Sequence, residues 1–325
     1  MADLPSHIAA RRSARRQEIR RRRMMVLGAL GALAAVIIVA VALLALGGGG
    51  SSTGRHASAG TGAAGSPRHG GAPRTAPATG ALTGVEANGN ARIRSLAQLG
   101  LPVYCGGGHG DEVAFTFDDG PGPYTHLALK KLTQAGERAT FFVVGKSMAS
   151  FPGYTPRELR VAAIGDHTMT HPVLPALSAQ DIGSQISGTK RMIEAESGQS
   201  VDLMRPPYGS RNAVVDQTAK RLGLLDIIWT VDSADSLGAN YAGIIRNVEA
   251  GLHPGSIILM HENRGQTIRA LTTLLPVLGQ RHLRSVSLPQ LFADDPPTAA
   301  QVKAGPNGCG VAGRVPAGTG TSAAG

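Results

Sequence analysis

Short apolar runs alternate with longer amphipathic segments along most of the chain after about residue 91. The apolar runs cover residues 113–117, 139–144, 224–231 and 256–260. Helical periodicity covers about 125–135, 178–197, 212–222 and 266–279. Ser178 and Asn212 are suitable N-caps, and Gly198 and Gly223 are suitable helix stops. The alternation predicts parallel strands joined by helices, an α/β fold, with one domain over 91–293.

One apolar stretch is too long for a strand. Residues 24–46 are 23 positions without a charge, and about 20 apolar residues in a helix cross the bilayer core. Eight Arg precede this stretch within residues 1–23. Because such clusters stay cytoplasmic, we expect a single-pass cell-membrane protein with an extracytoplasmic domain. A cleaved signal peptide ending near Ala40-Val41-Ala42 is the alternative, but the apolar run exceeds the roughly 7–15 residues of a signal-peptide core.

Composition changes again on both sides of the predicted domain. Residues 47–90 and 294–325 are rich in Gly, Ala and Pro, so we expect a disordered linker and a loose C-terminal tail. The formal net charge is +10, of which residues 1–23 carry +6 and residues 47–90 carry +2. The remainder is too small for a surface that follows phosphates, so we expect no nucleic-acid partner. We also expect no obligate protein partner.

The two cysteines, Cys105 and Cys309, bracket the predicted domain. The expected topology places both in an oxidising compartment, where a disulfide would join the tail to the start of the domain. Two free thiols are the alternative. Metal ligation is less favoured because neither cysteine belongs to a Cys-x-x-Cys pair.

Two adjacent carboxylates, Asp118 and Asp119, end the first predicted strand. The carboxyl ends of strands are where α/β folds place their sites. Because adjacent side chains diverge, one carboxylate can bind a metal while its neighbour remains a base. A turn explains the sequence Asp-Asp-Gly-Pro equally well.

A second candidate group consists of His167 and His171, which are four residues apart. In a helical turn both imidazoles would point the same way, and Asp119 would complete a facial triad for one divalent metal ion. Zn²⁺ is the favoured ion, with Co, Mn or Fe as alternatives. A chance pair of surface histidines is the competing interpretation.

Three further predicted strand ends carry polar groups. Arg205 precedes two prolines and Tyr208, so the backbone that aims Arg205 is fixed. Asp232 and Asp235 follow Trp229, and His261 closes the strand that contains Leu259. Each has a structural interpretation alone, such as a rigid loop or a packed histidine. Five strand ends that each supply Asp, His or Arg predict an active site of the barrel type.

The order and spacing of these motifs, with Ala-Thr-Phe-Phe-Val at 139–143, resemble the NodB-like polysaccharide deacetylases of carbohydrate esterase family 4. The resemblance covers about residues 111–293. It implies a distorted (β/α) barrel that removes acetyl groups from a glycan polymer with one divalent metal ion. The implied roles are general base for Asp118, metal ligands for Asp119, His167 and His171, orientation of the base for Arg205, general acid for His261, and pairing with that acid for Asp235.

The resemblance also implies a substrate pocket. The Tyr208 amide would be the oxyanion donor and Leu259 part of the acetyl pocket, and we place Pro206, Trp229 and Ser236 beside them. Ser236 stands where the family commonly has Trp, which removes one apolar wall. Asp166 and Glu262 stand where the family often has Asn and Asp.

A tether of some 40 residues gives a reach of about 35 Å, which favours a polymer near the membrane. We therefore expect N-deacetylation of peptidoglycan N-acetylglucosamine. Chitin, poly-N-acetylglucosamine or xylan are alternative substrates, and a non-catalytic glycan-binding module is an alternative function.

Overall fold

The computed structural model describes residues 84–310. The expected cytoplasmic tail, the expected membrane segment at 24–46 and most of the expected linker lie outside these residues. Among residues 84–310, no helix has both the length and the apolar character that crossing a membrane requires.

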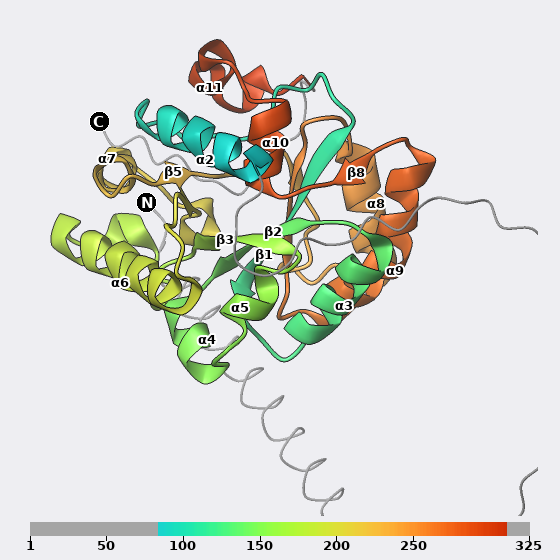
Figure 1. The fold of residues 1–325 in the computed structure, drawn as a ribbon, viewed down its shortest axis with the longest axis horizontal. Coiled ribbons are helices and arrows are strands. Elements are labelled where there is room, and N and C mark those ends of the chain that lie inside the picture. Colours follow the sequence, from blue (N-terminus) through green and yellow to red (C-terminus); the bar gives the residue numbers. More distant parts are fainter. Residues whose placement is uncertain (1–83, 311–325) are drawn as a thin grey trace, which may run out of the picture. The chain divides into compact units, whose positions relative to one another are not determined.

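The described strands form one open, curled sheet in which all pairings between strands are parallel (Figure 1). Their order is β5-β4-β3-β2-β1-β7-β6, and β8 pairs with the start of β1. The bounds are β1 Glu112–Gly120, β2 Ala139–Val143, β3 Ala162–Asp166, β4 Leu203–Met204, β5 Leu225–Asp226, β6 Val231–Asp232, β7 Ile257–His261 and β8 Arg284–Ser285. No ladder joins β5 to β6 among the described residues, so the expected distorted barrel is a curled half-barrel.

The apolar run 224–231, which reads as one strand, forms the two short strands β5 and β6. The segment before β1 explains the interruption. The Val103 amide donates to the carbonyl of Asp226 (2.9 Å), and the Ile228 amide donates to the carbonyl of Val103 (2.8 Å). The backbone between the two strands therefore pairs with the N-terminal part of the domain.

Helices flank the sheet and continue beyond both ends of the expected domain (Figure 1). The predicted helices form with N-caps at Ser178 and Asn212, as the sequence indicates. The α-helices are α2 Gly84–Ala97, α3 Thr125–Ala135, α4 Gly145–Ser150, α5 Thr155–Glu158, α6 Ala179–Ser197, α7 Ala213–Arg221, α8 Tyr241–Gly251, α9 Gly265–Gln280, α10 Leu288–Asp294 and α11 Ala299–Ala304. Three 3₁₀ turns are η1 Leu174–Ala176, η2 Pro207–Gly209 and η3 Gly305–Gly308.

Two apolar cores lie on the two faces of the sheet. Successive side chains of a strand point to opposite faces. In β1, Phe115 and Phe117 belong to the outer core, which also includes buried residues of α3, α6 and α9. Ala114 of the same strand belongs to the inner core, which α2 and α10 supply with Ile93 and Phe292. The inner face is thus filled by helices from the two ends of the domain.

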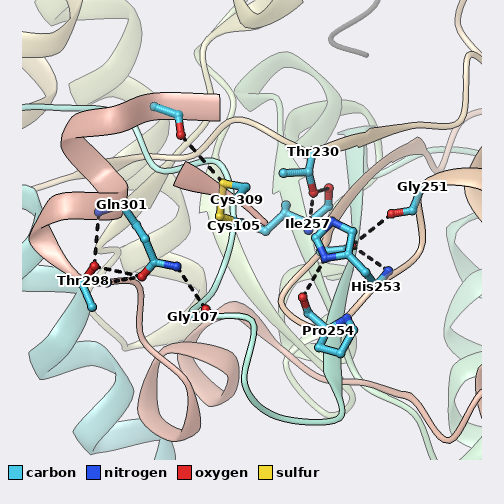
Figure 2. The surroundings of a disulfide bond; sticks show 12 residues. Cys105, Gly107, Thr230, Gly251, His253, Pro254, Ile257, Thr298, Gln301 and Cys309 are labelled. Atoms are coloured by element: carbon cyan, nitrogen blue, oxygen red, sulfur yellow. Dashed lines mark hydrogen bonds between the residues drawn. A yellow bond between two sulfur atoms is a disulfide. The ribbon is translucent and has the colours of Figure 1, made fainter. Parts of the chain in front are cut away.

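The expected boundaries of the domain are too narrow at both ends. Helix α2 begins at Gly84, inside the expected linker, and it packs on α10 so closely that a Cβ on Gly89 would lie 1.8 Å from the Pro289 carbonyl oxygen. At the other end α11 and η3 occupy the expected loose tail. Cys105 and Cys309 form a disulfide, and Gln301 Nε2 donates to the carbonyl of Gly107 (3.0 Å; Figure 2).

Candidate active site

The inner face of the sheet changes from apolar to charged along the strands. In β1 the inward positions are Ala114, Thr116 and Asp118, and the ladder pairs these with Ile257, Leu259 and His261 of β7. The amino ends therefore contribute apolar side chains and the carboxyl ends a carboxylate beside an imidazole. This register brings the candidate base and the candidate acid together.

Arg205 fixes one oxygen of the candidate base. Its side chain is fully buried, and Nη1 donates to Asp118 Oδ1 and to Thr116 Oγ1, both at 2.8 Å. The remaining guanidinium bonds go to backbone carbonyls at 227 and 228. Burial raises the pKa of Asp118, and the charges of Arg205 and His261 oppose that rise without cancelling it. Asp118 Oδ2 is left on the side of His167, 3.6 Å from Nε2.

Asp119, His167 and His171 offer three ligand atoms that lie within 4.8 Å of one another. Oδ1 of Asp119 is 3.2 Å from Nε2 of His171 and 3.7 Å from Nε2 of His167. The Nδ1 atom of His167 lies 2.7 Å from the carbonyl oxygen of Arg205, to which it donates. This tautomer leaves Nε2 with its lone pair, and burial lowers the pKa of His167, so the imidazole stays neutral. Two imidazoles and a carboxylate fit a divalent ion such as Zn²⁺.

The two histidines do not lie in a helical turn, which corrects the expectation from their spacing. Residues 167–173 form an irregular loop in which Thr168 and His171 have φ values of 69° and 58°. The Thr168 hydroxyl accepts from the His171 amide (3.1 Å), and the two imidazole centroids are 4.8 Å apart. The loop folds back on itself and so achieves the convergence that we expected from a helix.

Left-handed backbone recurs in the loops at this edge of the sheet. A non-glycine residue in this region costs about 1 kcal/mol or more and persists only where surrounding contacts enforce it. Five such residues are in these loops: Asp119, Thr168, His171, Tyr208 and Ala234. Strain is therefore concentrated on segments that carry the candidate site.

His261 is paired with a buried carboxylate. Its Nδ1 lies 2.7 Å from Asp235 Oδ1, and its backbone amide donates to Asp235 Oδ2 at 2.8 Å. Burial alone would lower the pKa of His261, but the Asp235 bond and the nearby carboxylates outweigh it and raise the pKa to about 9. At neutral pH this side chain is protonated, with Nε2 as the nitrogen that can give up a proton.

The expected pocket residues lie in different surroundings. Leu259 is buried, with Thr116 and Asp232 as its neighbours in the ladder. Tyr208 is 62% exposed, and its ring centroid lies 4.6 Å from that of His171. Ser236 is exposed to solvent on the turn after Asp235.

The residues around η2 pack close to Arg205 and Trp229. Pro206 is buried, and the Trp229 ring lies 5.6 Å from the Arg205 guanidinium carbon. A Cβ on Gly209 would lie 2.8 Å from Trp229, so the absence of a side chain allows this approach.

Sequence reasoning missed three polar residues that hold the site. Thr116 bonds Arg205, Thr267 donates to Asp235, and Asn263 donates to Asp119. Only the inward alternation of β1 could have indicated Thr116. Asn263 and Thr267 contact the site through the loop and helix after β7, which no spacing within the motifs reveals.

The arrangement defines a class of protein: a parallel half-barrel with a candidate acid–base pair beside a candidate metal triad. The polysaccharide deacetylase family model matches residues 106–226. The peptidoglycan-N-acetylglucosamine deacetylase of Bacillus cereus is 34% identical over 187 residues, which cover 56% of this chain and 68% of that protein. A chitooligosaccharide deacetylase of Bradyrhizobium is 34% identical over 196 residues, covering 55% and 90%. The chain therefore belongs to the polysaccharide deacetylase family.

Other similar proteins differ in length and in the function described for them. The peptidoglycan-N-acetylglucosamine deacetylase of Listeria monocytogenes is 36% identical over 184 residues, but these cover 56% of this chain and only 39% of that protein. A family 4 carbohydrate esterase structure from Streptomyces lividans is 34% identical with a TM-score of 0.52, covering 54% and 92%. A family 4 pseudoenzyme structure from Bacillus anthracis is 30% identical with a TM-score of 0.56, covering 59% and 68%.

Proposed function

We propose that this chain is a metal-dependent deacetylase that removes the N-acetyl group from N-acetylglucosamine in peptidoglycan. The observation that carries the proposal is the common location of three groups at one edge of the sheet. These are Asp118 held by Arg205, the triad of Asp119 with two imidazoles, and His261 held by Asp235. Amide hydrolysis needs an activated water, stabilisation of an oxyanion and a proton for the amine that leaves.

Each residue has a defined part in this reaction. A bound divalent ion would supply Lewis-acid polarisation of the water and of the acetyl carbonyl. Asp118 takes the proton from water through Oδ2, because Arg205 occupies Oδ1. The Tyr208 backbone amide donates to the developing oxyanion, and protonated His261 gives its proton to the amine.

Peptidoglycan is the proposed substrate because two kinds of support agree. Relatives from Bacillus and Listeria carry the name of a peptidoglycan N-acetylglucosamine deacetylase. A membrane anchor at 24–46 and a linker would hold the domain near the cell wall. Chitin-type oligomers, poly-N-acetylglucosamine and xylan are the substrates that the experiment below must compare.

We place the domain outside the cytoplasmic membrane, with the N-terminus inside. The support is the Cys105–Cys309 disulfide, since such bonds persist in oxidising compartments and are rare in the cytosol. The Arg cluster before the proposed span has the charge bias of a cytoplasmic flank. Zn²⁺ is the proposed ion because two imidazoles and a carboxylate form a donor set that it favours.

A second candidate function is glycan binding without turnover. The similar structure from Bacillus anthracis is described as a pseudoenzyme, so the half-barrel itself does not guarantee activity. In this chain Asp118 is hydrogen-bonded to Arg205, Asp119 to Asn263 and His261 to Asp235, and this complete set of supported groups favours catalysis.

The test is acetate release by the 325-residue chain, loaded with Zn²⁺ or Co²⁺, from peptidoglycan and from chitin oligomers in parallel. We expect acetate from peptidoglycan and at least about 10²-fold slower release from Asp118→Asn that has bound one equivalent of metal. Stoichiometric metal with no acetate from either polymer would support the binding function instead. Faster release from chitin oligomers would move the substrate to that polymer.

A further inference from the structure

The segment after β7 contacts the turn that carries the candidate metal ligand. Asn263 Nδ2 donates to Asp119 Oδ2 at 3.2 Å. The other oxygen, Oδ1, is the one that faces both imidazoles. The amide therefore occupies the carboxylate oxygen that is turned away from the triad.

Glu262, in the same segment, packs against the turn that carries Asp119. A Cβ on Gly120 would lie 1.4 Å from Glu262 Oε1, so the turn rests directly on this buried carboxyl group. The Glu262 amide donates to the carbonyl of Asp118 at 3.3 Å. The Thr125 hydroxyl donates to the Glu262 carboxylate and accepts from the Gly122 amide. The turn that carries Asp119 is thereby clamped between β7 and the start of α3.

Asp119 needs such support because its backbone is left-handed, with φ 73°. Its carbonyl also accepts from the Ser147 hydroxyl at 3.2 Å. A carboxylate with one oxygen unrestrained could rotate about its last side-chain bond and take Oδ1 away from the imidazoles. The bond from Asn263 restricts that rotation.

We propose that Asn263 is a positioning residue of the metal site, which orients the Asp119 carboxylate so that Oδ1 points at the two histidines. This inference rests on the proposed function, since it assumes that the triad binds a divalent ion. Outer partners that hold a ligating carboxylate typically change metal affinity about 10- to 100-fold when removed. Strand β7 and the turn after it then carry two roles within three residues, the proposed acid at His261 and the ligand support at Asn263.

The test compares metal affinity rather than turnover. The 325-residue chain is prepared metal-free as the unsubstituted protein, Asn263→Ala, Asn263→Leu and Asn240→Ala. Asn263→Leu keeps most of the side-chain volume without a donor. Asn240→Ala is the matched control, because it removes a side-chain hydrogen bond at the α8 N-cap. Zn²⁺ affinity is measured by competition with a chromophoric chelator, and Co²⁺ absorption reports the ligand geometry.

We expect both Asn263 variants to lose about 10-fold or more in Zn²⁺ affinity and to change the Co²⁺ spectrum, while Asn240→Ala matches the unsubstituted chain. Affinities within twofold of the unsubstituted chain would overturn the proposal. A loss in Asn263→Ala alone would overturn it too, because packing rather than the donor would then be responsible. If the unsubstituted chain binds no metal, both the proposed function and the role of Asn263 fail. This outcome differs from the two above, in which only the role of Asn263 fails. Metal-free melting of each variant verifies that it is folded.

Discussion

The two ends of the half-barrel are built on opposite principles. At the amino end of the strands, α2 and α10 fill the inner face with apolar side chains, and a disulfide joins the segment before β1 to the tail. At the carboxyl end, the inner face carries buried charge, and five loop residues have left-handed backbone. Stability and chemistry are therefore assigned to separate ends of one sheet, as in barrel enzymes.

Buried carboxyl groups differ in how fully they are hydrogen-bonded, and unpartnered oxygens occur at both ends of the described sheet, Glu112 Oε2 at the start of β1 among them. Near the turn that carries Asp119, both carboxyl oxygens of Glu158 and Oε1 of Glu262 lack hydrogen-bond partners among the described residues. Burial raises the pKa of Glu158 to about 8. At the amino end, Asp295 instead accepts from the amides of His109 and Gly110, and these bonds hold its pKa below the ordinary value against the effect of burial.

The largest effects are expected when the two adjacent carboxylates, Asp118 and Asp119, are substituted one at a time. Asp118→Asn should lower kcat by roughly 10²- to 10⁴-fold, the range for loss of a general base, and should retain metal. Asp119→Ala should abolish stoichiometric Zn²⁺ binding because it removes the ligand shared by both imidazoles. Metal analysis and acetate release on each variant make the comparison. Retained metal in Asp119→Ala would contradict the ligand assignment.

Breaking the amino end should affect stability and leave the chemistry intact. The double variant Cys105→Ser, Cys309→Ser opens a loop whose ends are 204 residues apart in sequence, and the expected loss of unfolding free energy is about 2–5 kcal/mol. Denaturant melts under non-reducing conditions measure this loss. Below the melting transition kcat/KM should stay within about twofold. A large fall in kcat/KM for the folded variant would show that the two ends are coupled.

The pH dependence of activity tests the pair of His261 and Asp235 at the carboxyl end of the strands. The pKa of His261 is about 9, above its ordinary value, so pairing with Asp235 stabilises the fold fully below about pH 6.5 and that contribution is lost as pH rises through about 9. Activity should fall over the same alkaline range as the acid loses its proton. Asp235→Asn should move the alkaline limb of kcat to lower pH. An unmoved limb would assign that titration to another group.

The smallest effect is expected at the rim of the site. Ser236 is exposed, and its neighbour Leu237 is 78% exposed, so this turn has room for a larger apolar side chain. Ser236→Trp should lower KM for an N-acetylated oligosaccharide by a few-fold with little change in metal affinity, because an apolar contact on this exposed turn should contribute about 1 kcal/mol, the low end of the range for a hydrophobic pocket. Steady-state kinetics with chitin oligomers measure it. A fall in kcat without a fall in KM would exclude a simple wall for the acetyl pocket.

Long periodic segments and strand ends could be predicted from sequence because local chemistry determines them. Helix α6 begins after Ser178 and ends before Gly198, with a glycine φ of 68° at the stop. The extent of β4, β5, β6 and β8 could not be predicted, since strands of two residues are too short to show a period of two. Helix α2 has a sequence rich in Gly and Asn, and it is stabilised by packing on α10 rather than by propensity.

The candidate site divides in the same way. The sequence could place Asp118, Asp119, Arg205 and His261 at or just after strand ends, and the structure has them there. We expected His167 and His171 to converge through a helical turn, but they converge through a loop with positive φ values. These φ values could not be predicted from the residue types. Supporting residues such as Thr116 and Asn263 are defined only by tertiary contact.

The register between β1 and β7 fixes the spacing of Asp118 and His261, whatever the length or sequence of the surrounding loops. Asp118 and His261 are partners on neighbouring strands, so their separation follows from the spacing of the sheet, about 4.8 Å, and not from any loop. Loops that carry Tyr208 or Ser236 could be lengthened or exchanged without moving the base away from the acid. If the proposed function holds, a designer could therefore rebuild the loops around the candidate site and leave the spacing between Asp118 and His261 unchanged.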